Sequence, residues 1–323
     1  MFNPSDIDAR FEDLQTKRAE DCFYESLSVI ASGPDADRAV EIRLAVASRG
    51  PTWADRTVEF SFLAMTQSGQ AWFSVERFRW NQWALRRGLL METQGLKFTP
   101  NHCKGGLGDN RWDILIGGGS GSLPLLPGKW RMYRDGADHL RQYTHQANLK
   151  LAGEIHLGTE TWDLEGWTGH RPHVWGESLP RSTRLAVHAW QDGMPRALEA
   201  AVGPLDIAPG LSSDHAQRGV LRGPELERRW MRTATPAEPG SLNLQGRGVV
   251  VSVQADDLLP IRSMGPHGDV LRQVSPFARV QVSGDFSGAS KAGWIEYLSD
   301  DADRAPFPPV DLAPRAGSFS IHR

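Results

Sequence analysis

The segment TVEFSFLAMTQSGQAWFSVERF, residues 57–78, decides the fold class of this chain. Two runs rich in β-branched and aromatic residues, 57–65 and 71–78, flank the polar stretch TQSGQ. Such runs are typical of β-strands, and a short connection that contains glycine joins antiparallel neighbours. The segment therefore predicts a β-hairpin.

Similar runs recur on both sides of the hairpin, separated by Gly, Pro, Asp and Ser. Residues 74–88, SVERFRWNQWALRRG, are the best candidate for a helix, although they could also form a strand that continues into a loop. The other runs predict strands at 23–30, 39–47, 112–116, 143–155, 183–190, 197–202, 228–233, 248–254, 277–282 and 293–298. We therefore expect an all-β, mostly antiparallel protein with few short helices.

The chain has 323 residues, enough for two domains of ordinary size. The predicted strands fall into two halves of similar length, which allows a pair of β-barrels. We place an N-terminal β domain at residues 1–160 and a C-terminal β domain at residues 161–323.

Charge and composition narrow the class of partner. The net charge is -3, from 36 Lys and Arg against 39 Asp and Glu, so the chain lacks the basic character of nucleic-acid-binding proteins. The N-terminus is charged and no run approaches the ~18 apolar residues of a membrane span, so we expect a cytoplasmic protein without membrane insertion. The two cysteines, Cys22 and Cys103, fit a reducing compartment, and a single disulfide stays open. The oligomeric state is not indicated.

Aromatic usage points to an apolar ligand. The chain has 12 Trp and only 4 Tyr, and indoles supply a large apolar area with a single hydrogen-bond donor. Such a composition is typical of a cavity that binds a hydrophobic small molecule.

The segment EGWTGHRPHVWG, residues 165–176, is the strongest candidate for a functional site. It sets His170, Arg171 and His173 between Trp167 and Trp175, with three glycines that allow sharp turns. Two interpretations stay open: a polar site in an aromatic cavity, or a tight Trp-packed junction between domains whose histidines are satisfied.

Three other kinds of site are not favoured. The stretch GGGSG at 117–121 follows a predicted strand, but SLPLLPGK comes next, and its prolines oppose the helix that a phosphate-binding loop needs. Ser120 lacks the second glycine of a hydrolase elbow. His170, His173 and His188 show no established metal-ligand spacing, so we expect neither a metal nor a cofactor.

Acid–base chemistry fits the residues of the segment best. A histidine beside an apolar wall can donate or accept a proton near neutral pH, and His173, between two tryptophans, is the leading candidate. A carboxylic acid in the same wall would have a raised pKa. Tyr143 and His188 are further candidates for contact with a ligand. Side chains alternate between the two faces of a strand, so Asp138, His139, Tyr143 and His145 could also lie on a solvated face.

The segment GWTGHRPHVWGE, the following STRLAVHAWQDG and the later KAGWIEYLSD resemble elements of the carotenoid 1,2-hydratase and tocopherol-cyclase-like superfamily. The resemblance implies two lipocalin-like antiparallel β-barrel domains. It also implies hydratase, cyclase or pericyclase-type activity on terpenoids or polyketides. His173, Trp175 and Gly176 match the family element, and Trp190 lies on the next strand. An acidic residue often precedes this histidine in the family, whereas Pro172 stands here, so the candidate carboxylates become Asp163, Glu165 and Glu177.

Together these observations predict a cofactor-independent isomerase, cyclase or hydratase that acts on a terpenoid, steroid or polyketide. His173 would move the proton and His170 or Arg171 would orient a polar group, while Trp167, Trp175 and Trp190 would shape the pocket. Holding the reacting atoms together would itself lower a barrier. A carrier of an apolar ligand without chemistry, or a structural Trp-rich module, are the alternatives.

Overall fold

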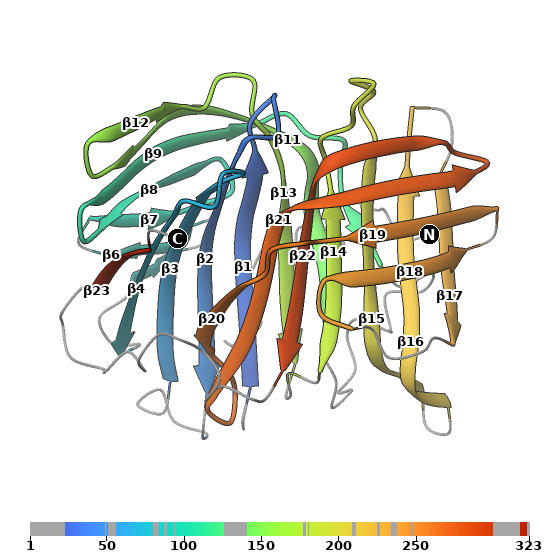
Figure 1. The fold of residues 1–323 in the computed structure, drawn as a ribbon. Coiled ribbons are helices and arrows are strands. Elements are labelled where there is room, and N and C mark those ends of the chain that lie inside the picture. Colours follow the sequence, from blue (N-terminus) through green and yellow to red (C-terminus); the bar gives the residue numbers. More distant parts are fainter. Residues whose placement is uncertain are drawn as a thin grey trace.

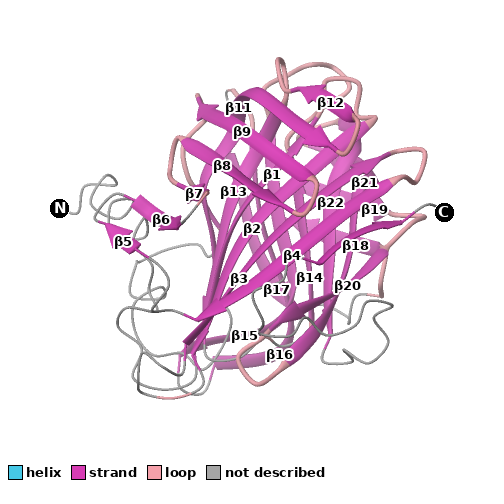
Figure 2. Ribbon diagram, turned by 90° about the vertical axis from the view of Figure 1, so that its left-hand side faces the viewer, coloured by secondary structure: helices cyan, strands magenta, loops and turns pink. Residues whose placement is uncertain are grey.

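The computed structural model consists of β-strands and connecting loops (Figure 1). It describes residues 23–48, 50, 56–79, 84–86, 89–93, 95–125, 141–176, 179, 181–208, 211–224, 227–233, 238–246, 248–299 and 317–321. Within these ranges every regular element is a strand, as Figure 2 also shows, so the all-β prediction is confirmed without the few short helices. No helix of the described ranges could cross a membrane.

The first of the two antiparallel sheets has 14 strands, in the order β23-β4-β3-β2-β1-β13-β11-β9-β8-β7-β6-β5, with β10 and β12 paired to β11. Its strands are β1 (Phe23–Ser32), β2 (Arg38–Ser48), β3 (Arg56–Thr66), β4 (Ala71–Arg79), β5 (Ala84–Arg86), β6 (Leu89–Thr93), β7 (Leu96–Phe98), β8 (His102–Leu107), β9 (Asn110–Gly117), β10 (Leu123–Pro124), β11 (Arg141–Leu157), β12 (Glu160–Asp163), β13 (Thr168–Gly176) and β23 (Gly317–Ile321).

The second sheet has nine strands, in the order β17-β16-β15-β14-β22-β21-β19-β18, with β20 paired to β21. Its strands are β14 (Ser182–Val187), β15 (Ala197–Ala208), β16 (Leu211–Arg222), β17 (Glu227–Thr233), β18 (Ser241–Gly246), β19 (Val249–Gln254), β20 (Leu259–Met264), β21 (Asp269–Gly284) and β22 (Gly288–Ser299). This sheet forms a nearly closed barrel, because its end strands β17 and β18 come into contact, whereas the first sheet forms a half-barrel.

The hairpin that decides the fold class lies where the sequence places it. β3 and β4 pair in register from Thr57 opposite Arg79 to Met65 opposite Ala71. Gly69 adopts a φ of 95° in the connecting turn, a conformation that favours glycine. The described residues of the candidate helix at 74–88 instead form the end of β4 and the strand β5. In β4, Trp72 packs with one apolar cluster whereas Ala71, Phe73 and Val75 pack with another, which is the alternation of a strand.

The chain passes from the first sheet to the second between Gly176 and Ser182. The strand β13 before this crossing pairs with β1 on one side and with β11 on the other. The segment 165–176 is therefore a turn at Gly166 followed by a central strand of the first sheet. The division into domains at residues 160 and 161 stays a prediction.

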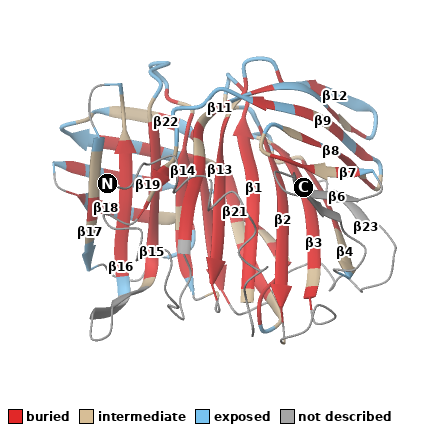
Figure 3. Cartoon of the chain, turned by 180° about the vertical axis from the view of Figure 1, so that it is seen from behind, coloured by how far each residue is buried: buried red, intermediate tan, exposed pale blue. Residues whose placement is uncertain are grey.

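The three largest apolar clusters of the described residues form the cores of the molecule, and the strands between them are buried on both faces (Figure 3). The first core fills the concave face of the first sheet, where Phe60 and Phe62 of β3 stack on Trp112 of β9. The second fills the barrel of the second sheet. The third lies between the sheets and includes Ile30 and Phe73 from the first sheet and Trp294 from the second. We call this third region the interface.

Candidate functional site

A chain of three buried polar side chains crosses the concave face of the first sheet. His173 on β13 contacts Glu25 on β1, with 2.6 Å between Nε2 and the carboxylate Oε1. Its other nitrogen, Nδ1, lies 2.9 Å from Nε2 of His145 on β11. We call Glu25, His173 and His145 the histidine relay. Both ring nitrogens of His173 thus contact protein groups.

Strand register brings the relay together. β13 lies between β1 and β11, so that Leu27 and Tyr143 are the register partners of His173 on its two sides. Glu25 shares its face of β1 with Leu27 and Val29 of the first core, since side chains alternate along a strand. An acidic residue therefore occupies a position that the strand otherwise gives to apolar side chains.

A β-bulge places His145. The register of β11 against β13 pairs Thr144 with Pro172 and Gln146 with Arg171, which leaves His145 as the extra residue. Bulges re-aim a side chain locally and occur often next to active sites. A second irregularity follows at Asn148, whose φ is 52°.

Aromatic and cationic side chains surround the relay. Trp175 lies 4.6 Å from the ring of His173 and Tyr143 lies 5.1 Å from the ring of His145, centroid to centroid. The guanidinium of Arg171 stands 5.9 Å from the ring centroid of Phe98, on the same concave face. Burial lowers the pKa of His145 well below its usual value, and repulsion by His173, when that ring is protonated, and by Arg171 lowers it further.

For a neutral His173, hydrogen bonding fixes the direction of the relay. A carboxylate accepts but cannot donate, so Glu25 requires the hydrogen of His173 on Nε2. Neutral His173 then accepts at Nδ1, and His145 must donate from Nε2, which leaves its Nδ1 as a free lone pair. No described residue forms a hydrogen bond with this Nδ1. His145 is also the most exposed member, at 8% against 0% for Glu25 and His173, so the relay presents a base at its outer end.

The structure places the predicted site residues in several different regions. The concave face brings together His173, Arg171, Trp175 and Tyr143. His170 and His188 instead meet at the interface, 5.1 Å apart between ring centroids, where His188 contacts Ser32. Burial lowers the pKa of both imidazoles, that of His170 to about 4.

The remaining predicted residues lie elsewhere. Trp167 packs beside Trp162 in the first core. Trp190 belongs to the second barrel, where its Nε1 donates to the carbonyl of Arg196. Asp163 is exposed and accepts a hydrogen bond from the amide of Glu165 in a turn. Glu177 lies outside the described residues, as do Cys22, Asp138 and His139.

Two members of the relay did not stand out in the sequence. The sequence pattern left open whether His145 lies on the solvated or the buried face of its strand, and it did not single out Glu25. The available signal for Glu25 is its position, because it precedes Leu27, Val29 and Ala31 at the spacing of one strand face. The structure thus pairs His173 with an acid 148 residues away in the chain, and not with a neighbouring one.

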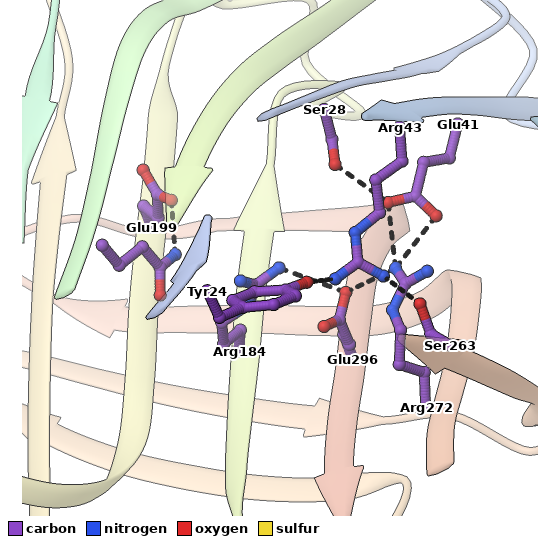
Figure 4. Close-up of polar contacts among 10 residues, drawn as sticks. Tyr24, Ser28, Glu41, Arg43, Arg184, Glu199, Ser263, Arg272 and Glu296 are labelled. Carbon is purple, nitrogen blue, oxygen red and sulfur yellow. Dashed lines mark hydrogen bonds and ion pairs between the residues drawn. The ribbon is translucent and has the colours of Figure 1, made fainter. Parts of the chain in front are cut away.

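A second polar cluster lies at the interface, where charges are paired with one another (Figure 4). Arg272 of β21 donates to both carboxylate oxygens of Glu41, at 2.9 and 3.0 Å, and to Glu296 at 2.8 Å. Arg184 also contacts Glu296, at 3.1 Å. Burial would raise the pKa of Glu296, but Arg184 and Arg272 hold it below its usual range.

Glu199 lies beside this cluster, and no arginine of the described ranges forms an ion pair with it. Gln142 donates to its Oε1 at 2.6 Å, which ties β15 of the second sheet to β11 of the first. Burial raises the pKa of this carboxyl to about 7, against the opposing effects of Thr144 and Gln142. A cavity of about 10 Å³ borders Glu199, Gln142 and Pro172, which is space for one water molecule. Gln142 alternates with Tyr143, so Glu199 and the relay lie on opposite faces of the first sheet.

The described residues contain no cluster of three or more His, Cys, Asp or Glu that could hold a metal ion. The glycine-rich stretch at 117–121 is fastened at Ser120, whose amide donates to Ala147 and whose carbonyl accepts from Arg222 of the second sheet.

No protein-family model and no curated protein sequence matches the chain. Solved structures do match. A Nitrosomonas europaea protein provisionally named AttH superposes with a TM-score of 0.62 at 13% identity, covering 93% of this chain and 97% of that one. Kievitone hydratase from Nectria haematococca superposes with a TM-score of 0.52 at 9% identity, covering 88% and 90%. At these identities the likeness concerns the fold, which extends over nearly the whole length of each protein.

Proposed function

We propose that the protein is a cofactor-independent enzyme that isomerises, cyclises or hydrates a hydrophobic small molecule, with His145 as its base. The observation that carries this proposal is the histidine relay, set into an apolar and aromatic face. The shared fold with kievitone hydratase and the sequence resemblance to the carotenoid hydratase and tocopherol-cyclase-like superfamily support the same class of reaction.

In an isomerisation, Nδ1 of His145 takes a proton from a carbon next to a carbonyl, and the electron pair of that C–H bond forms the enolate. The proton on His145 exchanges with solvent, and His145 then delivers a proton to a different carbon, so no co-reactant is consumed. In a hydration, His145 takes the proton from water as the C–O bond forms, and returns it to the neighbouring carbon. General base catalysis of this kind contributes roughly 10²- to 10⁴-fold to a rate.

Each other member of the relay has a distinct task. When His145 holds a proton, it carries a positive charge that its surroundings oppose, as its lowered pKa shows. Glu25, through His173, supplies the compensating negative charge. His173 is therefore a positioning residue that holds His145 in the right tautomer, and Tyr143 and Trp175 shape the apolar contact with the substrate.

The test is turnover of a panel of terpenoid, steroid and polyketide precursors in deuterium oxide, followed by mass spectrometry and NMR. We expect a product that carries deuterium at the carbon that is protonated. The variant His145→Gln should lose about 10²- to 10⁴-fold in kcat with a much smaller change in KM.

The matched control is His156→Gln, a partly exposed histidine on the same strand whose Nε2 lies 3.0 Å from Glu154. It should leave turnover unchanged. A product without deuterium would show that the enzyme acts by controlling the shape of the substrate and not by acid–base chemistry. Saturable binding without turnover of any precursor would identify a carrier.

A further inference from the structure

A cleft of about 390 Å³ opens between the two sheets, away from the histidine relay. One side is formed by the turn that joins β3 to β4, and the other by the loop between β19 and β20 together with β21 and β22. Its volume lies in the range of sites that bind small molecules. The lining residues Met65 and Ala71 belong to the apolar core of the interface, whereas the relay lies on the concave face.

The floor of the cleft is apolar. Met65, Ala71 and Leu259 are buried in the interface core, and Phe277 is partly exposed and packs against that core. A ligand that covers these side chains would gain roughly 25 cal/mol for each Å² of apolar surface removed from water. The floor therefore suits the hydrocarbon part of a ligand.

The rim of the cleft is charged, and its cations differ in their partners. Arg279 binds Asp256 through two contacts, at 2.6 and 2.9 Å. Lys291 is exposed on β22, and within the described ranges its ammonium forms no ion pair. Asp257 stands on the same rim. Lys291 is thus the cation of the rim that remains available to a ligand.

We propose that this cleft binds an amphipathic small molecule with one anionic head group, whose apolar part covers Phe277 and Leu259 and whose head lies at Lys291. The site is separate from the proposed reaction at His145, so its occupant is a second ligand and not the substrate. Its recognition rests on two features of different chemistry, an apolar floor and one free cation, which can be tested separately.

The experiment compares three probes of equal chain length, decanoate, decanol and decylammonium, by titration calorimetry below their micelle concentrations. The protein should bind decanoate about fivefold more tightly than decanol, the most that an exposed ion pair usually contributes, and decylammonium most weakly. Lys291→Gln should abolish the preference for decanoate and leave decanol unchanged. Phe277→Ser should weaken all three.

The control is Lys150→Gln, an exposed lysine on β11 that does not line the cleft. It should bind every probe as the unchanged protein does. Equal affinity for decanoate and decylammonium, or a preference that survives Lys291→Gln, would overturn the anionic head. Full binding by Phe277→Ser would overturn the cleft itself. Neither result touches the proposed function, because turnover is measured separately.

Discussion

The concave face of the first sheet and the interface between the sheets both bury ionisable side chains, but they use them differently. At the interface, Arg272 binds Glu41 and Glu296 directly, so opposite charges cancel within one cluster. On the concave face, Glu25 is followed by two imidazoles in a row, and the outer one presents a lone pair. Buried charge by itself therefore does not mark a reactive site.

The largest effect expected from this comparison is on stability. Arg272→Met leaves Glu41 and Glu296 buried without their shared cation, and breaking such a pair costs about 3–5 kcal/mol. Urea unfolding measures this loss. Arg279→Met removes an exposed pair with Asp256 and should cost about 1 kcal/mol or less. Similar losses in the two variants would show that the interface does not depend on its charges.

The next effect is on turnover and concerns the relay as a unit. Glu25→Gln and His145→Gln should each reduce kcat by about 10²-fold or more, and the double variant should be little worse than the poorer single one. Such non-additivity arises because both changes disable the same base. If the loss of kcat in the double variant were the product of the two single losses, Glu25 and His145 would act independently. Glu25→Gln should also shift the acid limb of the pH profile of kcat/KM, which a merely structural role would not do.

A third effect is the loss of stability at acidic pH, to which the buried histidines contribute. The pKa of His170 falls from 6.5 unfolded to about 4 folded, so only the unfolded chain gains a proton between these values. Stability is then lost as pH falls from about 6.5 to 4, by up to about 3.4 kcal/mol from this group. His145 and His188 act in the same direction. His170→Phe should flatten this limb of a stability profile, and an unchanged limb would remove His170 as its source.

The smallest effect, counted between about pH 6 and pH 8, has the opposite sign. The pKa of Glu199 rises from 4.5 to about 7 on folding, so the folded protein keeps a proton that the unfolded chain releases. Its contribution is full below about 4.5 and declines as pH rises through 7, by about 1.3 kcal/mol between about pH 6 and pH 8. Glu199→Gln, which mimics the protonated acid, should remove this decline in thermal unfolding. A decline that persists in the variant would assign it to another group.

The fold was largely predictable from local patterns. The hairpin of residues 57–78 and the long strand from Tyr143 to Ile155 follow from apolar runs and turn residues, which act over short distances. The candidate site was predictable only in part. His173 stood out among tryptophans, but its partners depend on which strands become neighbours and on a bulge at His145, neither of which local periodicity encodes. Trp190 follows His173 closely in the chain and yet fills the other barrel.

The strand β13 is the wall between the two regions, with His173 on one side and His170 on the other. Side chains alternate with a period of two, so a one-residue insertion or deletion in this strand would exchange the faces of every residue beyond it. His173 would turn toward the interface arginines and away from Glu25. Point substitutions in β13 alter one region at a time, whereas a single inserted or deleted codon would disable both together. We therefore expect the length of this strand to be more constrained than the identity of most of its residues.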